Sequence, residues 1–369
     1  MALTKKCLLS ILLATCGLAM LSLSGCGQDD ENTTPPAASQ YDFASVDALL
    51  SDYQDQFNGS VLVLVMRDDS LIYEQQLGNL SSQSKIPVAS ASKWVSGAVI
   101  LALNNAGVLD IHHPVVNYLP EFDTTYKDQI TPFHCFSLQS GIRECTGLDA
   151  TCITSRNDIT LREAAAEGAH EQQVALPGTA LYYGSLSMEI AGAAAEVASG
   201  KDWESLLQEY IAVPCGMSTT DFGNGLHAKV AGGMRTTASD YLRFLTMVRN
   251  NGIYNGERVL SGEAVETMFS AWTLDKPVIY SPYPHNPPFH PYAADTIYYG
   301  FGGWMDVINP ATNEVEQMSS PGAFGTYPWI DRKRRLSAII FTFSTYQEVV
   351  AEELEIIQAI RDAVDTYDQ

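Results

Sequence analysis

The chain has 369 residues, of which 46% are hydrophobic and 17% charged, and its formal net charge is −22 at pH 7. Such an acidic surface repels nucleic acid and anionic lipid headgroups, so we expect no nucleic-acid partner. The length and the apolar content are ample for a buried core and allow one large domain or two intertwined ones.

The first 25 residues are typical of an export signal. Two lysines precede an apolar run that ends in Leu-Ser-Gly-Cys26. This ending resembles the bacterial lipobox, which implies cleavage before Cys26, lipidation of Cys26 and a membrane anchor. Because Gly27 follows, the resemblance implies the outer membrane, facing the periplasm, in a Gram-negative host. An ordinary signal peptide with a coincidental cysteine is the alternative. Residues 26–40 are polar and predict a flexible tether.

Hydrophobic periodicity predicts the elements of the remaining body, residues 41–369. The predicted helices are 41–57, 158–166, 185–198, 203–211, one that starts at Ser239, and 347–367. The predicted strands are 61–66, 71–77, 301–307, 325–330 and 336–343. Two strands come early and three come late, so we expect the two ends of the domain to meet in one sheet. Residues 275–295, rich in Pro, Tyr and His, predict a long ordered loop of the type that borders sites.

This pattern predicts an α+β fold. We expect an antiparallel sheet of about five strands, formed by the N- and C-terminal segments and flanked by helices. A mainly helical subdomain, at about residues 107–250, is expected to be inserted between the two groups of strands.

Ser90 and Lys93 form a Ser-x-x-Lys motif at the start of a helix that is apolar almost all round. Residues three apart share one helix face. A serine hydroxyl needs a base beside it, and desolvation and the positive helix end both favour a neutral lysine. The motif is short, and a helix-capping serine followed by a surface lysine is the alternative. A second copy, Ser82-x-x-Lys85, lies in a polar loop with no apolar period after it.

Two further segments could complete a hydrolase site. A Pro-Gly turn leads to Tyr182 and Tyr183 just before a buried helix, where a phenol could transfer a proton. The segment Ser-Pro-Gly-Ala-Phe-Gly, residues 320–325, could supply backbone N–H donors for an oxyanion. Taken alone, the tyrosines indicate packing and the glycine segment indicates a strand-entry turn.

The order and spacing of these pieces resemble the serine β-lactamase and penicillin-binding-protein superfamily, above all class C β-lactamases and related carboxylesterases and D-stereospecific peptidases. Residues 130–141, which end in Ser-Gly, and residues 232–240, which begin Gly-Gly-Met-Arg-Thr-Thr, resemble two further signatures of that superfamily. The resemblance covers nearly the whole body and implies a β-lactamase/transpeptidase-like fold.

The resemblance also implies roles for individual residues. Ser90 is expected to be the acylated nucleophile, with Lys93 and Tyr183 as its proton-transfer partners; Tyr182 is the less favoured tyrosine. The backbone N–H groups of Ser90 and Ala323 are expected to form the oxyanion hole. His134 is expected to be structural.

Three residues are expected to contact substrate: Ser185, Ser320 and Gly322. Two of them depart from the superfamily pattern. Ser185 stands where the superfamily has an asparagine, and Ser320 stands where it has a lysine or histidine. Both departures weaken an assignment as a β-lactamase or D-Ala-D-Ala peptidase, and both leave the acylation machinery in place.

The cysteines predict a disulfide but no metal site. Cys145 and Cys152 are close enough in sequence to clip a short loop in an oxidising periplasm. Neither a Cys-x-x-Cys nor a His-Glu-x-x-His motif occurs in the body of the chain, and no metal or cofactor is indicated.

The favoured hypothesis is a lipid-anchored serine hydrolase that forms an acyl-enzyme on small-molecule carboxylic esters or small amides. The first alternative is a β-lactamase or D-Ala-D-Ala-type peptidase. The second alternative is a binding protein that keeps the pocket and has lost turnover. The sequence indicates no particular protein partner.

Overall fold

The computed structural model describes residues 40–144, 151–282 and 298–369. The helices are α1 (Ala44–Asp52), α2 (Ser92–Asn105), α3 (Pro132–Phe136), α4 (Leu161–Gly168), α5 (Leu186–Ser199), α6 (Trp203–Leu207), α7 (Ala238–Arg249), α8 (Gly262–Met268) and α9 (Tyr346–Tyr367). The strands of the large sheet are β1 (Val61–Arg67), β2 (Ser70–Leu77), β9 (Trp304–Ile308), β10 (Val315–Ser319), β11 (Tyr327–Asp331) and β12 (Leu336–Thr342). The short strands are β3 (Ile86–Pro87), β4 (Leu181–Tyr182), β5 (Arg235–Thr236), β6 (Ile253–Tyr254), β7 (Glu257–Arg258) and β8 (Val278–Tyr280).

The large sheet is antiparallel throughout, in the order β2-β1-β12-β11-β10-β9. The first strand pairs with the last along its whole length, from Val61 opposite Thr342 to Arg67 opposite Leu336. The predicted α+β fold, with the two ends of the domain meeting in one antiparallel sheet, is therefore confirmed.

The predicted number of about five strands is too low, because the sheet has six strands. The strand that the sequence pattern missed is β10. Strand β10 contains Glu316 and Gln317, which are residue types that are not enriched in strands. No apolar run therefore indicates this strand in the sequence. Gln317 is nevertheless buried, and its side-chain amide donates to the Asp306 carboxylate on β9 at 3.1 Å. A tertiary hydrogen bond thus compensates for a weak local pattern.

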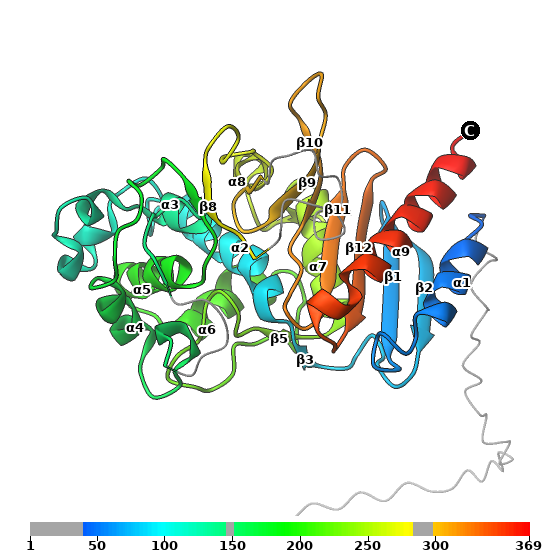
Figure 1. The fold of residues 1–369 in the computed structure, drawn as a ribbon, viewed down its shortest axis with the longest axis horizontal. Coiled ribbons are helices and arrows are strands. Elements are labelled where there is room, and N and C mark those ends of the chain that lie inside the picture. Colours follow the sequence, from blue (N-terminus) through cyan, green and yellow to red (C-terminus); the bar gives the residue numbers. More distant parts are fainter. Residues whose placement is uncertain (1–39, 145–150, 283–297) are drawn as a thin grey trace, which may run out of the picture. The chain divides into compact units, whose positions relative to one another are not determined.

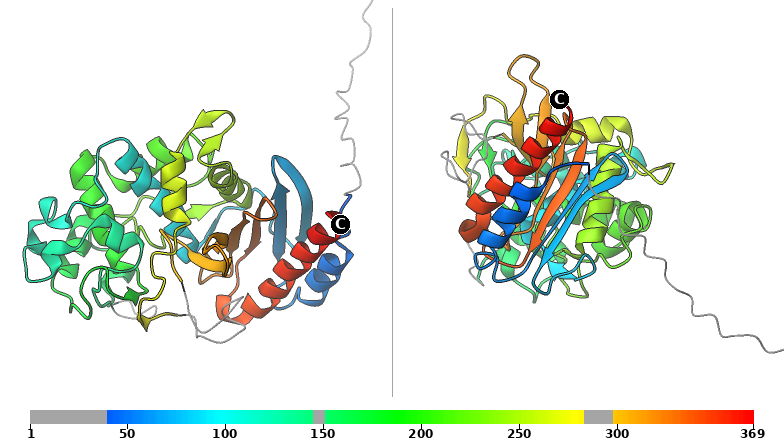
Figure 2. Two further views of the ribbon diagram at one scale, coloured as in Figure 1. Left: turned by 90° about the horizontal axis from the view of Figure 1, so that it is seen from above. Right: turned by 90° about the vertical axis from the view of Figure 1, so that its right-hand side faces the viewer.

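The sheet is covered on both faces. Helices α1 and α9 lie side by side on one face, so the two ends of the domain are neighbours (Figure 2). Helix α7 packs against β11 and β12 and, together with the sheet, adjoins the helix-rich part of the molecule (Figure 1). Since α7 begins at Ala238, the sheet-packed region starts before residue 250, where we expected the helical subdomain to end.

Most predicted helices are present with shifted ends. Helices α5 and α9 lie within a residue of their predicted bounds, whereas α1 is shorter at both ends. We expected Ser239 to cap the helix that starts there, but α7 begins at Ala238 and its cap is Thr237, whose hydroxyl accepts the N–H of Asp240 at 3.1 Å. Helix α6 ends at Leu207 and continues as a π-helical turn over Gln208–Ala212.

Glu353 interrupts the apolar pattern of the buried face of α9. Glu353 is fully buried, and within the described part of the chain neither of its carboxyl oxygens has a hydrogen-bond partner. Burial raises the pKa of Glu353 well above its usual value. The folded protein therefore holds this carboxyl in its neutral form.

Glu353→Met is expected to stabilise the protein more at pH 7 than at pH 4. Below the usual pKa of about 4.3 the carboxyl is protonated in both states; above it the unfolded chain releases the proton that the folded chain retains. The wild-type protein therefore loses stability as the pH rises. The methionine variant has no carboxyl to titrate, so at neutral pH we expect its free energy of unfolding to exceed that of the wild type by about 1–3 kcal/mol. Urea unfolding at both pH values measures the difference. Glu352→Met, on the half-buried neighbour, is the control, and an equal gain at both pH values would contradict the expectation.

Candidate active site

Ser90 lies in a short 3-10 turn, Ala89–Ala91, that leads directly into α2. Ala89 has a φ of 45°, a left-handed backbone conformation that is unfavourable for a residue with a Cβ atom. The turn is held in place by the Ser92 hydroxyl, which donates to the Ala89 carbonyl at 2.6 Å and accepts from the Met234 N–H at 3.0 Å. The half-buried Ser90 is thus fixed at the N-terminal end of a buried helix.

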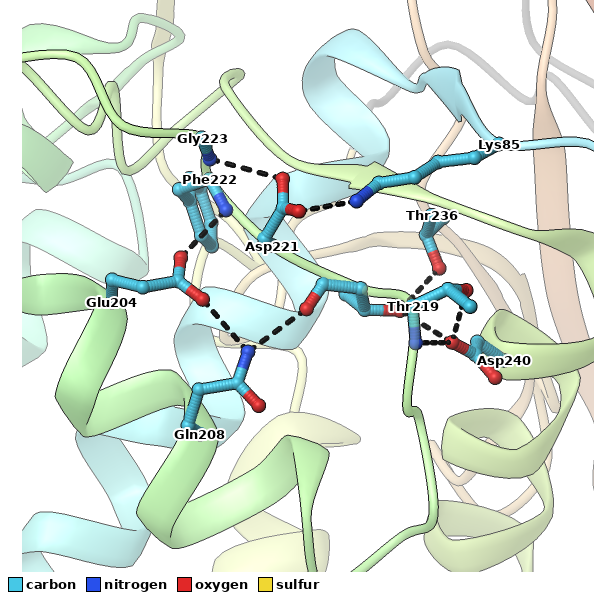
Figure 3. Close-up of polar contacts among 10 residues, drawn as sticks. Lys85, Glu204, Gln208, Thr219, Asp221, Phe222, Gly223, Thr236 and Asp240 are labelled. Carbon is cyan, nitrogen blue, oxygen red and sulfur yellow. Dashed lines mark hydrogen bonds and ion pairs between the residues drawn. The ribbon is translucent and has the colours of Figure 1, made fainter.

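The strand before this turn is anchored by a polar network (Figure 3). Strand β3 pairs with β5, and the segment that precedes β5 is tied to the start of α7. There the buried Asp240 carboxylate accepts from the N–H of Thr219 at 2.8 Å and from its hydroxyl at 2.7 Å. Lys85 forms an ion pair with Asp221 in the same network. Among the described residues no hydrogen bond joins Lys85 to Ser82, so the second Ser-x-x-Lys copy lacks the contact that Lys93 makes with Ser90.

Lys93 is the buried partner of Ser90. Its side chain, on the first turn of α2, is only 1% exposed. Its side-chain nitrogen Nζ lies 3.1 Å from Ser90 Oγ and 3.0 Å from the carbonyl oxygen of Ala231. The same nitrogen lies 5.1 Å from the centroid of the Tyr183 ring. The structure therefore brings together all three residues that the sequence predicts as catalytic.

The two consecutive tyrosines border different cavities. Tyr183 lines the same cavity as Ser90, and its ring stacks on Trp304 with centroids 4.9 Å apart. Tyr182 lines a neighbouring cavity, where its ring contacts Tyr280 at 5.7 Å. The geometry favours Tyr183 as the proton-transfer group, as the sequence indicated.

The expected oxyanion donors come from the nucleophile turn and from the segment between β10 and β11. The Ser90 N–H lies at the start of a helix, where N–H groups have no intrahelical partner. Ala323 lines the same cavity, and its N–H donates no hydrogen bond to any described residue. Gly322 lets this segment approach the nucleophile turn, because a Cβ atom there would lie 2.1 Å from the Val88 carbonyl oxygen.

Ser90, Tyr183 and Ala323 border a cavity of about 740 Å³, which is large enough for a small organic substrate. Its walls carry Ser90, Tyr183, Ser185 and Ala323, together with Tyr280 and Phe324. Tyr280 belongs to β8, in the segment that the sequence predicted as a long loop bordering a site; β8 pairs with β4 next to Tyr183.

Two of the three expected substrate contacts do not border this cavity. Ser185 borders it, whereas Ser320 and Gly322 do not. Ser320 is 3% exposed, and its hydroxyl donates to the backbone carbonyl of Ser90 at 3.2 Å. Ser320 thus supports the turn that carries Ser90, because it lies at the buried end of β10.

Glu189 is a buried carboxylate that sequence reasoning missed. It lies on α5 and accepts the N–H groups of Val230 at 2.9 Å and Ala231 at 3.2 Å. Its third contact is His227 Nε2 at 3.3 Å. Burial lowers the pKa of His227, but Glu189 outweighs that effect and the pKa is raised. Since the Ala231 carbonyl binds Lys93, Glu189 positions the loop that holds Lys93. An acidic residue among apolar neighbours on a predicted buried helix was the available signal.

Glu144 is the second carboxylate that the sequence did not single out. Its Oε2 atom accepts the N–H of Ser185 at 2.7 Å and also the N–H of Leu186, at the start of α5. Burial raises the pKa of Glu144, while these N–H groups and the charge of Lys93 oppose the rise. Glu144 borders the same cavity as Ser90.

The described residues also include or exclude the positions of several other expectations. His134 has a structural contact, as expected, because its N–H and ring pair with Thr131 in a helix cap. Cys26 and the predicted tether lie outside the described residues. Cys145 does so too, and the Cys145–Cys152 disulfide stays a prediction. Within the described ranges no cluster of potential metal ligands occurs, and no helix is both long and apolar enough to cross a membrane.

Comparisons with known proteins identify the family and the fold. The family model named Beta-lactamase matches residues 46–361. Penicillin-binding protein 4 of Amycolatopsis lactamdurans is 26% identical over 251 residues, which cover 57% of this chain and 64% of that protein. A solved structure of a candidate β-lactamase from Bacteroides dorei is 32% identical, with a TM-score of 0.76, and the match covers 88% of this chain and 99% of that one. The structure of EstCE1, a hydrolase with promiscuous acyltransferase activity, has a TM-score of 0.68 at 16% identity, over 87% and 98% of the two chains.

Proposed function

The chain belongs to the β-lactamase family of serine hydrolases, and we propose that it forms an acyl-enzyme on Ser90 with carboxylic esters or small amides. The observation that carries this proposal is the contact of 3.1 Å between Lys93 Nζ and Ser90 Oγ. A lysine that is 1% exposed and aimed at a serine in a cavity is arranged to take up the hydroxyl proton.

The proposed reaction has two steps. In the first, Ser90 Oγ attacks the substrate carbonyl while its proton passes into the pair formed by Lys93 and Tyr183. The N–H groups of Ser90 and Ala323 stabilise the negative carbonyl oxygen. The bond to the alcohol or amine then breaks, and the leaving group takes up the proton. In the second step water attacks the acyl-enzyme by the same route, which releases the acid and restores Ser90.

Esters are favoured over β-lactams because an uncharged serine occupies a position where the superfamily has a cation. In the superfamily a cation near the site meets the substrate carboxylate, and here that position is the buried Ser320. Lys229 borders the cavity, but its ammonium group donates to the Ser155 carbonyl at 2.9 Å. A lost charge-assisted hydrogen bond lowers kcat/KM by about 10- to 150-fold for substrates that need it.

The specificity is tested by comparing the hydrolysis of p-nitrophenyl butyrate with that of nitrocefin. We expect the ester to be turned over with the higher kcat/KM, since it carries no carboxylate. The ratio is measured with one enzyme preparation in one buffer, so errors in active-site concentration cancel. A higher kcat/KM for nitrocefin would contradict the proposal and favour the β-lactamase alternative.

The N-terminal sequence supports a location for this activity. The apolar run and the Leu-Ser-Gly-Cys26 ending favour export and lipidation at Cys26. We therefore propose a hydrolase held at an envelope membrane, and at the periplasmic side of the outer membrane in a Gram-negative host. Dual acylation makes such an anchor stable, since each buried methylene contributes about 0.8 kcal/mol.

A further inference from the structure

The carboxylate of Glu144 has one occupied and one open side. Its Oε2 atom accepts two backbone N–H groups at the start of α5. Among the described residues its Oε1 atom has no hydrogen-bond partner. The side chain borders the cavity of Ser90. An open carboxylate oxygen is therefore available to a ligand in that cavity.

The local chain is shaped to hold this side chain. Gly184 lies between Tyr183 and Ser185, and a Cβ atom at Gly184 would lie 2.7 Å from the carboxyl carbon of Glu144. The position thus leaves room for the carboxylate beside the tyrosine that faces Ser90. The two N–H groups of α5 fix the direction of Oε2 and so orient Oε1.

The other charged groups of the cavity are already engaged. Glu189 accepts two backbone N–H groups, one through each carboxylate oxygen, and His227. Lys229 donates to a backbone carbonyl. Among the charged groups at this cavity, within the described residues, Glu144 is therefore the one that keeps an open acceptor.

We propose, resting on the proposed function, that Glu144 binds a protonated amine in the acyl part of the substrate. The preferred substrates are then aminoacyl esters or amides, whose ammonium group lies one carbon from the scissile carbonyl. Acylation transfers the aminoacyl group to Ser90 Oγ and releases the alcohol or amine with the serine proton. The ammonium group and Oε1 of Glu144 form a charge-assisted hydrogen bond, which orients the carbonyl toward Ser90.

The test compares three methyl esters: alanine methyl ester in both enantiomers, N-acetylalanine methyl ester and methyl propionate. The assay is run at about pH 6.5, below the α-amino pKa of about 7.7–8.0, so that the amine is charged. Product acids are quantified by chromatography. We expect one enantiomer of alanine methyl ester to exceed both neutral esters in kcat/KM by about 10- to 100-fold.

Glu144→Gln keeps the shape of the side chain and removes its charge. We expect it to reduce the ratio of kcat/KM for the alanine ester over the N-acetyl ester by about 10- to 100-fold. Glu171→Gln is the matched control. Glu171 borders the two neighbouring cavities with Glu144 but not the cavity of Ser90, and this variant should leave the ratio unchanged.

The outcomes separate this inference from the proposed function. If the wild-type protein hydrolyses the neutral esters at least as fast as the alanine ester, the inference is wrong and the serine hydrolase remains. The same holds if Glu144→Gln leaves the ratio unchanged. If no ester is hydrolysed and a fluorescent phosphonate does not label Ser90, the proposed function itself fails. The wild-type comparison needs no variant, so it decides even if Glu144→Gln does not fold.

Discussion

Ser90→Ala is expected to lower the turnover of p-nitrophenyl butyrate by at least about 10⁴-fold. Lys93 contacts this hydroxyl at 3.1 Å. Among the described residues no other serine hydroxyl at the cavity has a hydrogen bond to a lysine. Without the hydroxyl no acyl-enzyme can form, and only binding and the oxyanion donors remain. Burst kinetics and labelling with a fluorescent phosphonate measure the loss directly.

Ser82→Ala is the matched control for this variant. It removes the serine of the second Ser-x-x-Lys copy, whose Lys85 is paired with Asp221. We expect labelling and turnover as in the wild type. Labelling that survives in Ser90→Ala and disappears in Ser82→Ala would show that the nucleophile is misassigned. A wild-type protein that is never labelled would favour the non-catalytic binding protein.

Tyr183→Phe is expected to reduce kcat by about 10²–10⁴-fold, the contribution of one acid–base group. The ring keeps its stacking on Trp304, since only the hydroxyl is removed, so the fold should be unaffected. The effect should fall on kcat more than on KM, because the phenol acts in proton transfer.

Tyr182→Phe tests the assignment between the two neighbours. The Tyr182 hydroxyl is directed to the Glu144 carbonyl at 3.4 Å and its ring lies in the neighbouring cavity. We expect this variant to keep most of its kcat. A near wild-type rate in Tyr183→Phe together with an inactive Tyr182→Phe would mean that the motif was aligned one residue too far along the chain.

The sequence was informative where local pattern and chemistry coincide. The apolar run after Lys93 predicts a buried helix, and a lysine at its start needs a polar partner; the structure supplies Ser90 Oγ and the Ala231 carbonyl. The turn before the buried helix indicated the pair Tyr182 and Tyr183, and the resemblance to the superfamily favoured Tyr183. The pairing of early and late strands followed from their order, and β1 with β12 confirms it.

What the sequence could not show depends on contacts between distant segments. Ser320 reads as a substrate contact, yet the end of β10 buries it beneath Ser90, 230 positions away in the chain. Glu144 has no periodic context, and its importance arises only because α5 presents two N–H groups to it. Strand β10 itself carries polar residues whose partners belong to β9. Tertiary hydrogen bonds of this kind leave no local mark.

The pairing of β1 with β12 has a consequence for the protein during its synthesis and folding. A chain that is synthesised or exported from its N-terminus presents the β1–β2 hairpin long before its partner strand exists. Until then the backbone N–H and C=O groups on the free edge of β1, a strand that carries the apolar residues Val61, Val63 and Val65, can pair with any other extended chain. Contacts of such high sequence separation also fold slowly. Loss of the last strand and helix would leave that edge permanently open, so C-terminally truncated chains should aggregate rather than persist as a smaller soluble domain.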